Sequence, residues 1–270
     1  MTTKVTFLAP ILLGLIIALG ACGSSGPATT YSDSVSLGNG TVRTYITTNQ
    51  AGGQSGTPIA VGVELTGSSF EALPAEHVEI VTPLPQEASV TPFKWMLLDW
   101  NPQGHIPPGV YDLPHYDFHF YIMDQAKRQE IKAGACEAGG EGVDCATLER
   151  GTKPVPAVYV APDHINVGAV VPGMGNHLID VTGPEFNGTK FNHTFIYGVF
   201  DGEVTFYEPM ITREFLLAKP DNACVDFKRP GGFATAGWYP TQYCMRYHQN
   251  TNTYTVSLEG FVSQPATTPQ

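Results

Sequence analysis

The sequence predicts an all-β protein, mainly an antiparallel β-sandwich or barrel, with a few short helices. The 270 residues include 29 glycines and 22 prolines, which indicates many turns. Threonine, valine, tyrosine and phenylalanine recur along the chain, and these residues favour strands. Short strand-like segments follow one another with few helical segments between them, as they do in sandwiches and barrels.

A lipoprotein export signal precedes the predicted domain. Lys4 is followed by an apolar run over residues 5–18, which is shorter than the roughly 20 residues that a membrane-spanning helix needs. The run leads to Leu-Gly-Ala-Cys at residues 19–22, where small residues before the cysteine fit a signal-peptide cleavage site. We expect residues 1–21 to be removed and the thiol of Cys22 to carry diacylglycerol. The protein would then be lipid-anchored in the cell envelope, on the periplasmic or extracellular side.

Behind the signal peptide, the sequence predicts three parts. Residues 22–30 are mostly small and predict a flexible tether between the lipid and the domain. Residues 31–262 predict a single β-rich domain, because this length is sufficient for a substantial core. Residues 263–270 predict a disordered tail.

Alternating residues and turn signals place the elements of the domain. The expected strands and hairpins cover residues 34–46, 58–65, 94–100, 114–123, 195–207 and 254–262. One hairpin is expected to turn at residues 38–40 and another at Asp201-Gly202, since such glycine-containing pairs favour tight turns. Two short helices are expected, over residues 124–133, with Asp124 as a possible cap, and over residues 212–218.

The remaining cysteines predict disulfides. Four cysteines follow Cys22, and an even number in an exported chain indicates two bridges. Of the three pairings, the simplest is local, with Cys136 joined to Cys145 and Cys224 to Cys244. A metal–thiolate site is the alternative, although the spacings differ from those of a zinc ribbon.

The predicted strand at residues 114–123 carries an unusual set of polar side chains. On a strand, alternate side chains point to opposite faces. One face would carry His115, Asp117 and His119, and the other would carry Tyr116, Phe118 and Phe120. Imidazoles and carboxylates are ligands for a divalent transition metal such as zinc, iron, manganese or copper. His115 and His119 are about 13 Å apart on an extended strand, so sharing one ion requires approach from opposite sides, twist or a bulge.

Two further residues are candidates for the same site. His177 follows a Gly-Met-Gly turn that could direct it inward, and Glu208 precedes Pro209 at the end of a strand. The predicted metal site therefore comprises His115, His119, His177 and Glu208, with Asp117 as a ligand or as the partner that orients a histidine. A hydrogen-bonded polar cluster without metal, and metal-free catalysis, are the alternatives. The other histidines are more typical of surface or turn positions, namely His105, His164, His193 and His248.

Residues 104–121 resemble the signature of an uncharacterised bacterial secreted or lipoprotein family, a domain of unknown function. A Pro-x-Met-Gly-x-His element of that family is matched by residues 172–177, and later elements are matched by residues 197–202 and 208–210. The resemblance covers about residues 97–217. It implies a β-rich secreted protein, and one Thermus member is linked to envelope-stress (sigma-E) regulation. The family implies no established activity.

The chain also has a weak likeness to cupins. Gly109, His115 and His119 are similar to the first cupin motif, and residues 172–177 are similar to the second. The two histidines are four residues apart, whereas the cupin motif places them two apart, and the second motif is shorter here. The likeness implies a cupin-like barrel as one form of the predicted all-β fold.

Charge and motifs limit the function. A formal net charge of −11 argues against nucleic acid and anionic lipid as partners, so the membrane contact is expected through Cys22 alone. No Gly-x-Ser-x-Gly elbow or phosphate-binding loop occurs. The sequence thus indicates an exported lipid-anchored protein with a His/carboxylate metal site; the alternative is a metal-dependent envelope enzyme, either a hydrolase, a lyase or a cupin-type oxygenase. A small-molecule ligand and a homo-oligomer are compatible with both.

Overall fold

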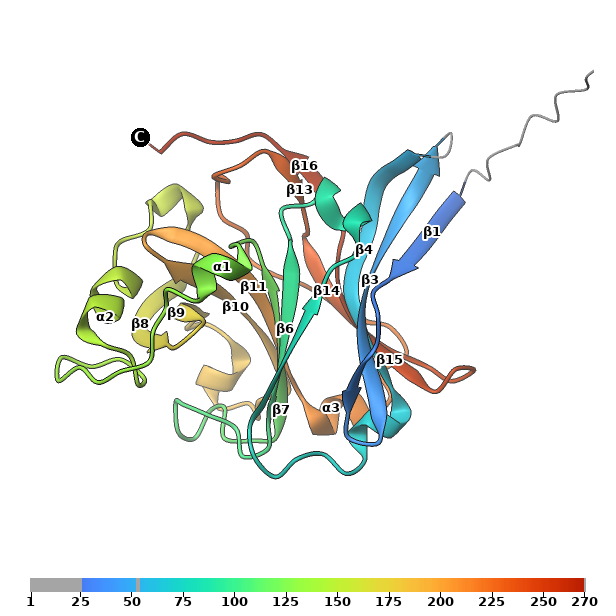
Figure 1. The fold of residues 1–270 in the computed structure, drawn as a ribbon, viewed down its shortest axis with the longest axis horizontal. Coiled ribbons are helices and arrows are strands. Elements are labelled where there is room, and N and C mark those ends of the chain that lie inside the picture. Colours follow the sequence, from blue (N-terminus) through green and yellow to red (C-terminus); the bar gives the residue numbers. More distant parts are fainter. Residues whose placement is uncertain (1–25, 52–53, 270) are drawn as a thin grey trace, which may run out of the picture.

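A computed structural model describes residues 26–51 and 54–269, and it confirms the all-β class. Two seven-stranded antiparallel sheets pack as a sandwich, with β3, β4 and β15 on one side and β6, β7 and β11 facing them (Figure 1). The predicted signal peptide and the predicted lipid attachment at Cys22 lie outside the described residues.

The first sheet has the strand order β1-β3-β4-β15-β14-β12, with β2 paired to β3. Its strands are β1 (Gly26–Tyr31), β2 (Val35–Leu37), β3 (Gly40–Ala51), β4 (Gln54–Thr66), β12 (Ala223–Asp226), β14 (Gln242–His248) and β15 (Thr253–Glu259). The second sheet has the order β5-β6-β7-β11-β10-β9-β8. Its strands are β5 (Val78–Pro83), β6 (Trp95–Asn101), β7 (His115–Tyr121), β8 (His164–Val171), β9 (Gly175–Asp180), β10 (His193–Phe200) and β11 (Glu203–Thr212).

Short elements complete the fold. A two-stranded ribbon pairs β13 (Gly237–Tyr239) with β16 (Val262–Gln264). The helices are α1 (Gln125–Arg128), α2 (Cys145–Gly151) and α3 (Arg213–Leu217), and the 3-10 turns are η1 (Gly67–Phe70), η2 (Gln86–Val90), η3 (Ala157–Tyr159) and η4 (Pro184–Asn187). Figure 1 shows α1 and α2 on the side of the second sheet that faces away from the first, near the strands β8 and β9 at the end of that sheet.

The predicted alternation of β7 is confirmed. Tyr116, Phe118 and Phe120 are buried in the largest hydrophobic core cluster. The ring of Phe70 links the two sheets there, with its centroid 5.7 Å from that of Tyr116 on β7 and 4.7 Å from that of Tyr254 on β15. The alternate side chains of β7 are therefore directed to the opposite face of the second sheet.

Local turn chemistry explains the elements that were predicted correctly. Asp201 and Gly202 have φ values of 54° and 81°, and positive values at both positions match the tight turn that joins paired strands. The hairpin turn after β2 is also present, with Gly38 at a φ of 53°. The side chain of Thr212 accepts a hydrogen bond from the amide of Phe215, which caps α3.

The helix expected over residues 124–133 is wrong beyond Arg128, where α1 ends. The side chain of Ile131 is buried in a small hydrophobic cluster, and Ala133 forms an isolated bridge with Val143. Because a continuing helix could not satisfy both contacts, the chain turns after Arg128. Tertiary packing thus overrides the helix-forming composition of this segment.

The two ends of the domain are also more ordered than expected. Residues 26–30 of the predicted tether belong to β1, which pairs with β3 along its whole length. Arg43 lies over the ring of Tyr31 at 3.8 Å and holds the end of this strand. In the predicted tail, β16 pairs with β13, and the amide of Thr267 donates to the carbonyl of Phe233 at 2.8 Å.

Both local disulfides are confirmed. Cys136 is bonded to Cys145, and Cys224 is bonded to Cys244. Their sulfur atoms are therefore not thiolates, so the alternative metal–thiolate site is excluded. Two disulfides are typical of an oxidising compartment.

Candidate metal centre

A cavity of about 710 Å³ lies on the face of the second sheet that is opposite to the main core. Asp117 and His119 from β7 and Glu208 from β11 line it, together with His177 from β9. The walls are largely apolar and come from β8, β10 and the loops around residues 105–111 and 172–174. The register of β8 against β9 is irregular between Asn166 and Val170.

His119, His177 and Glu208 converge at the cavity. One ligand atom from each lies within 4.8 Å of the other two. His119 Nε2 is 3.4 Å from Glu208 Oε1, and His177 Nε2 is 3.8 Å from Glu208 Oε2. Metal–ligand bonds of about 2.0–2.2 Å place two ligands of a tetrahedral ion about 3.3–3.6 Å apart, so small shifts would suffice to hold an ion.

Neighbouring groups orient these side chains. Nδ1 of His177 donates to the carbonyl of Ala169 at 3.0 Å, which leaves the lone pair of Nε2 directed toward Glu208. The ring of Phe206 packs against both imidazoles, at centroid distances of 4.8 Å from His119 and 5.4 Å from His177. These contacts restrict the orientations of the two imidazole rings.

Burial controls the charge of this group. It lowers the pKa of His119 to about 3 and also lowers the pKa of His177, so both imidazoles are neutral at pH 7. Burial raises the pKa of Glu208 well above its usual range, and the nearby carboxylates of Asp117 and Asp99 raise it further. Glu208 Oε2 and His119 Nδ1 are buried without a hydrogen-bond partner. A cation among the three side chains would favour ionised Glu208 and satisfy Oε2.

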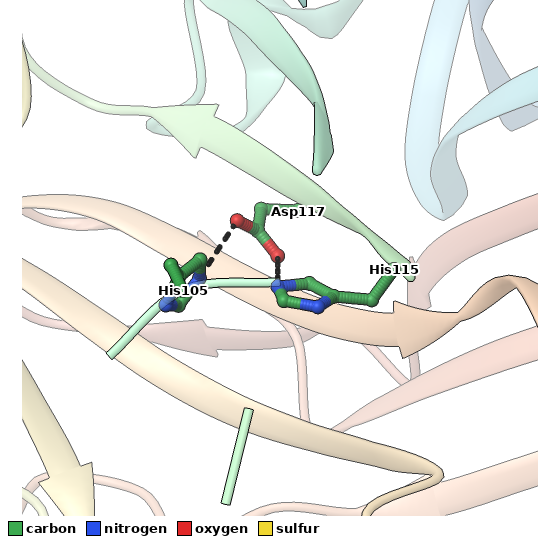
Figure 2. A group of neighbouring side chains, drawn as sticks. All are labelled: His105, His115 and Asp117. Carbon is green, nitrogen blue, oxygen red and sulfur yellow. Dashed lines mark hydrogen bonds and ion pairs between the residues drawn. The ribbon is translucent and has the colours of Figure 1, made fainter. Parts of the chain in front are cut away.

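His105, His115 and Asp117 form a second group (Figure 2). His105 Nε2 is 3.2 Å from Asp117 Oδ2, and His115 Nε2 is 3.1 Å from Asp117 Oδ1. Asn101 Nδ2 donates to Asp117 Oδ2 at 2.7 Å. Burial would raise the pKa of Asp117, but the two neighbouring histidines, above all the charge of a protonated His115, hold it well below its usual range.

The five residues predicted for one site are thus divided between two groups. His119, His177 and Glu208 meet, whereas His115 and Asp117 meet His105 instead. The pairing of β7 with β6 is regular from His115 to His119, so no bulge brings these two histidines together. On such a strand, residues two apart remain about 6.6 Å from each other.

Sequence reasoning missed His105 because it was assigned to the turns. His105 lies between Gly104, which has a φ of 71°, and a proline-rich turn that returns to β7. The signal that could have found it is its position in the same motif segment as His115 and Asp117. His77 and Asp99 were also missed, although both line the cavity.

No family model matches the chain, and no curated protein or solved structure matches it either. Within residues 26–51 and 54–269, none of the helices is long and apolar enough to cross a membrane. The function is therefore inferred from the geometry of the site.

Proposed function

We propose that the protein is an exported, lipid-anchored metalloprotein in which His119, His177 and Glu208 hold one divalent transition metal. The observation that supports this most strongly is the meeting of three ligand atoms within 4.8 Å, although they come from three different strands. Burying such polar groups without partners is costly, and a metal ion would offset that cost.

The ligand set favours a transition metal over calcium or magnesium. Calcium and magnesium prefer oxygen ligands, whereas two imidazoles and one carboxylate suit zinc or ferrous iron, as well as manganese and copper. Three protein ligands leave at least one coordination position open. The side chains of all three residues border the cavity, so a small molecule could reach that position.

A metal-dependent enzyme is the second candidate function. The cavity of about 710 Å³ favours it, since this volume falls within the range of small-molecule sites. A bound ion would supply Lewis acidity or an activated water there. A hydrolase, a lyase and an oxygenase are each compatible with this ligand set.

Elemental analysis of the purified full chain in detergent tests the metal site. The protein is stripped with a chelator, reconstituted with zinc and dialysed, and the bound zinc is measured. His177→Ala should bind one zinc per chain fewer than the wild type, because it removes a ligand. His248→Ala is the matched control, because the imidazole of His248 hydrogen-bonds only to Thr255, at 2.9 Å, among the described residues and lies in the first sheet.

Equal zinc content in the wild type and His177→Ala would contradict the proposal. Cobalt substitution then separates the two candidate functions. An exchangeable water on cobalt that His177→Ala abolishes would support the enzyme, whereas a coordinatively saturated ion would support a structural metal.

A further inference from the structure

We infer that His105, His115 and Asp117 form a second metal site, which is separate from the one at His119 (Figure 2). The three residues come from the loop before β7 and from β7 itself. They share no ligand with the proposed first site.

Hydrogen bonds fix which nitrogen of each ring carries a proton. His115 Nδ1 lies 2.6 Å from the carbonyl oxygen of Leu113, and His105 Nδ1 lies 2.7 Å from that of Ile106. A carbonyl oxygen can only accept, so each Nδ1 must donate a proton. In a neutral imidazole that is the only ring proton, so Nε2 presents a lone pair.

Both of these lone pairs face the same carboxylate. Nε2 of His115 is 3.1 Å from one oxygen of Asp117, and Nε2 of His105 is 3.2 Å from the other. A carboxylate also presents only lone pairs. His115 Nε2 and Asp117 Oδ1 are buried, with no hydrogen-bond partner. Between the rings and Asp117 the geometry therefore calls for an electropositive species, which is either a second ring proton or a metal ion.

A transition metal fits this requirement. The separations of 3.1 and 3.2 Å are close to the roughly 3.3 Å between two ligands of a tetrahedral zinc ion with bonds of about 2.0 Å. The backbone bonds at both Nδ1 atoms resemble the outer contacts that orient metal-bound histidines. Asn101 supports the carboxylate in the same way, by donating to Asp117 Oδ2.

His105, in the loop before β7, provides a route for the ion. The side chain of His105 is 36% exposed, whereas that of His115 is fully buried. An ion could therefore enter from the side of His105. Because the pairing of β7 with β6 is regular, the two sites are held apart and should bind their ions independently.

Zinc stoichiometry of the full chain in detergent tests the second site, with the same chelation and reconstitution. The wild type should bind two zinc ions per chain. His105→Ala and His177→Ala should each bind one, the double variant none, and His248→Ala two. His105→Gln provides a second substitution at the exposed position if His105→Ala does not fold, as judged by circular dichroism.

The outcomes distinguish the two proposed sites. A wild type with one zinc that only His177→Ala removes would overturn the second site and leave the first. One zinc that only His105→Ala removes would overturn the first and support the second. Nitrogen-15 NMR of the zinc-loaded protein adds a direct measurement, because protons on both nitrogens of His115 would mean that protonation, not metal, fills the gap, which would overturn the inference.

Discussion

Asp99 is a buried carboxyl on the face of the second sheet that borders the cavity. It is directly opposite Glu79 on β5 and Asp117 on β7, and like charges in such positions destabilise a sheet. Its Oδ2 is 3.7 Å from His77 Nε2, and its Oδ1 has no hydrogen-bond partner. Burial raises the pKa of Asp99 to about 7, and the charges of Asp117 and Glu79 contribute, although the nearby imidazole of His77 opposes the shift.

We predict that Asp99→Asn makes stability less dependent on pH. The pKa of Asp99 is raised in the folded state. Its favourable contribution to the unfolding free energy is therefore fully present below about pH 4 and is lost as the pH rises to about 7. Asparagine keeps the shape without ionising. The variant should therefore gain on the order of 2–4 kcal/mol relative to the wild type at pH 8, with a much smaller difference at pH 4. Urea unfolding in the presence of a chelator measures the unfolding free energy of both proteins at the two pH values.

Asp33→Asn provides the control, because Asp33 is exposed. It should leave the pH profile of the unfolding free energy unchanged. A difference between Asp99→Asn and the wild type that is the same at pH 4 and pH 8 would contradict the prediction, since it would reflect packing and not ionisation.

The candidate site could be predicted from the sequence only as far as residue types and strand alternation allow. His119 was found because it lies on an alternating strand. Glu208 was found because it precedes Pro209, but the strand end predicted there is wrong, since β11 continues to Thr212. The division of the predicted ligands into two groups was not predictable, because it depends on the regular pairing of β7 with β6. His105 depends on the path of a loop, which periodicity does not report.

At the level of elements, a glycine on β10 lets a side chain of β11 pack against the candidate metal ligands His119 and His177. A Cβ atom at Gly198 would overlap the ring of Phe206. Because Gly198 has no side chain, the ring of Phe206 can lie across β10 at this position. The same ring packs against His119 and His177, so the backbone of β10 and the two imidazoles are coupled through one aromatic side chain.

We predict that Gly198→Ala weakens both stability and metal binding. Displacing Phe206 should cost about 1–3 kcal/mol in unfolding free energy, as overpacked cores do. It should also lower zinc affinity at the His119 group by about 10-fold or more, because supports of metal ligands typically contribute that much. Chemical unfolding and competition with a zinc chelator measure the two effects.

Gly231→Ala is the matched control, because its Cβ would meet its nearest neighbour, the carbonyl oxygen of Val158, at an ordinary 3.8 Å. It should leave zinc affinity unchanged. If Gly198→Ala binds zinc as tightly as Gly231→Ala does, Phe206 does not position the ligands.

Elements were predictable where a local signal decides them. The turn at Asp201-Gly202 and the cap at Thr212 act within a few residues, so the sequence indicates them directly. The early end of α1 depends on the burial of Ile131 in a distant cluster. Likewise, β1 exists because it pairs with β3, and no pattern within residues 26–30 alone requires that.

For the whole molecule, the two faces of the second sheet have different roles. The main core uses one face of the second sheet, and the cavity uses the other. The loop closed by Cys136 and Cys145 extends to the cavity, since Glu141 lines it and donates its amide to the carbonyl of Val170 at 2.9 Å. This disulfide thus restrains one wall of the site, and should contribute about 2–4 kcal/mol to stability.

The proposed anchor would hold this domain close to the membrane. Because β1 begins at Gly26, three residues, 23–25, lie between a lipid-modified Cys22 and this strand. An extended chain spans about 3.5 Å per residue, so this segment reaches at most about 14 Å. Since the full sequence has a formal net charge of −11, the protein would gain little from an anionic surface, and the proposed lipid would supply the attachment.

We therefore predict that Cys22→Ala abolishes lipid attachment. The wild type, expressed in a bacterium and grown with labelled palmitate, should incorporate label, be cleaved before Cys22 and sediment with the membrane. The variant should incorporate none and stay uncleaved at this position, because the thiol is the acceptor. Ser24→Ala, two residues further along, should behave as the wild type does. Labelled Cys22→Ala would show that the lipid is attached elsewhere and would refute the proposed anchor.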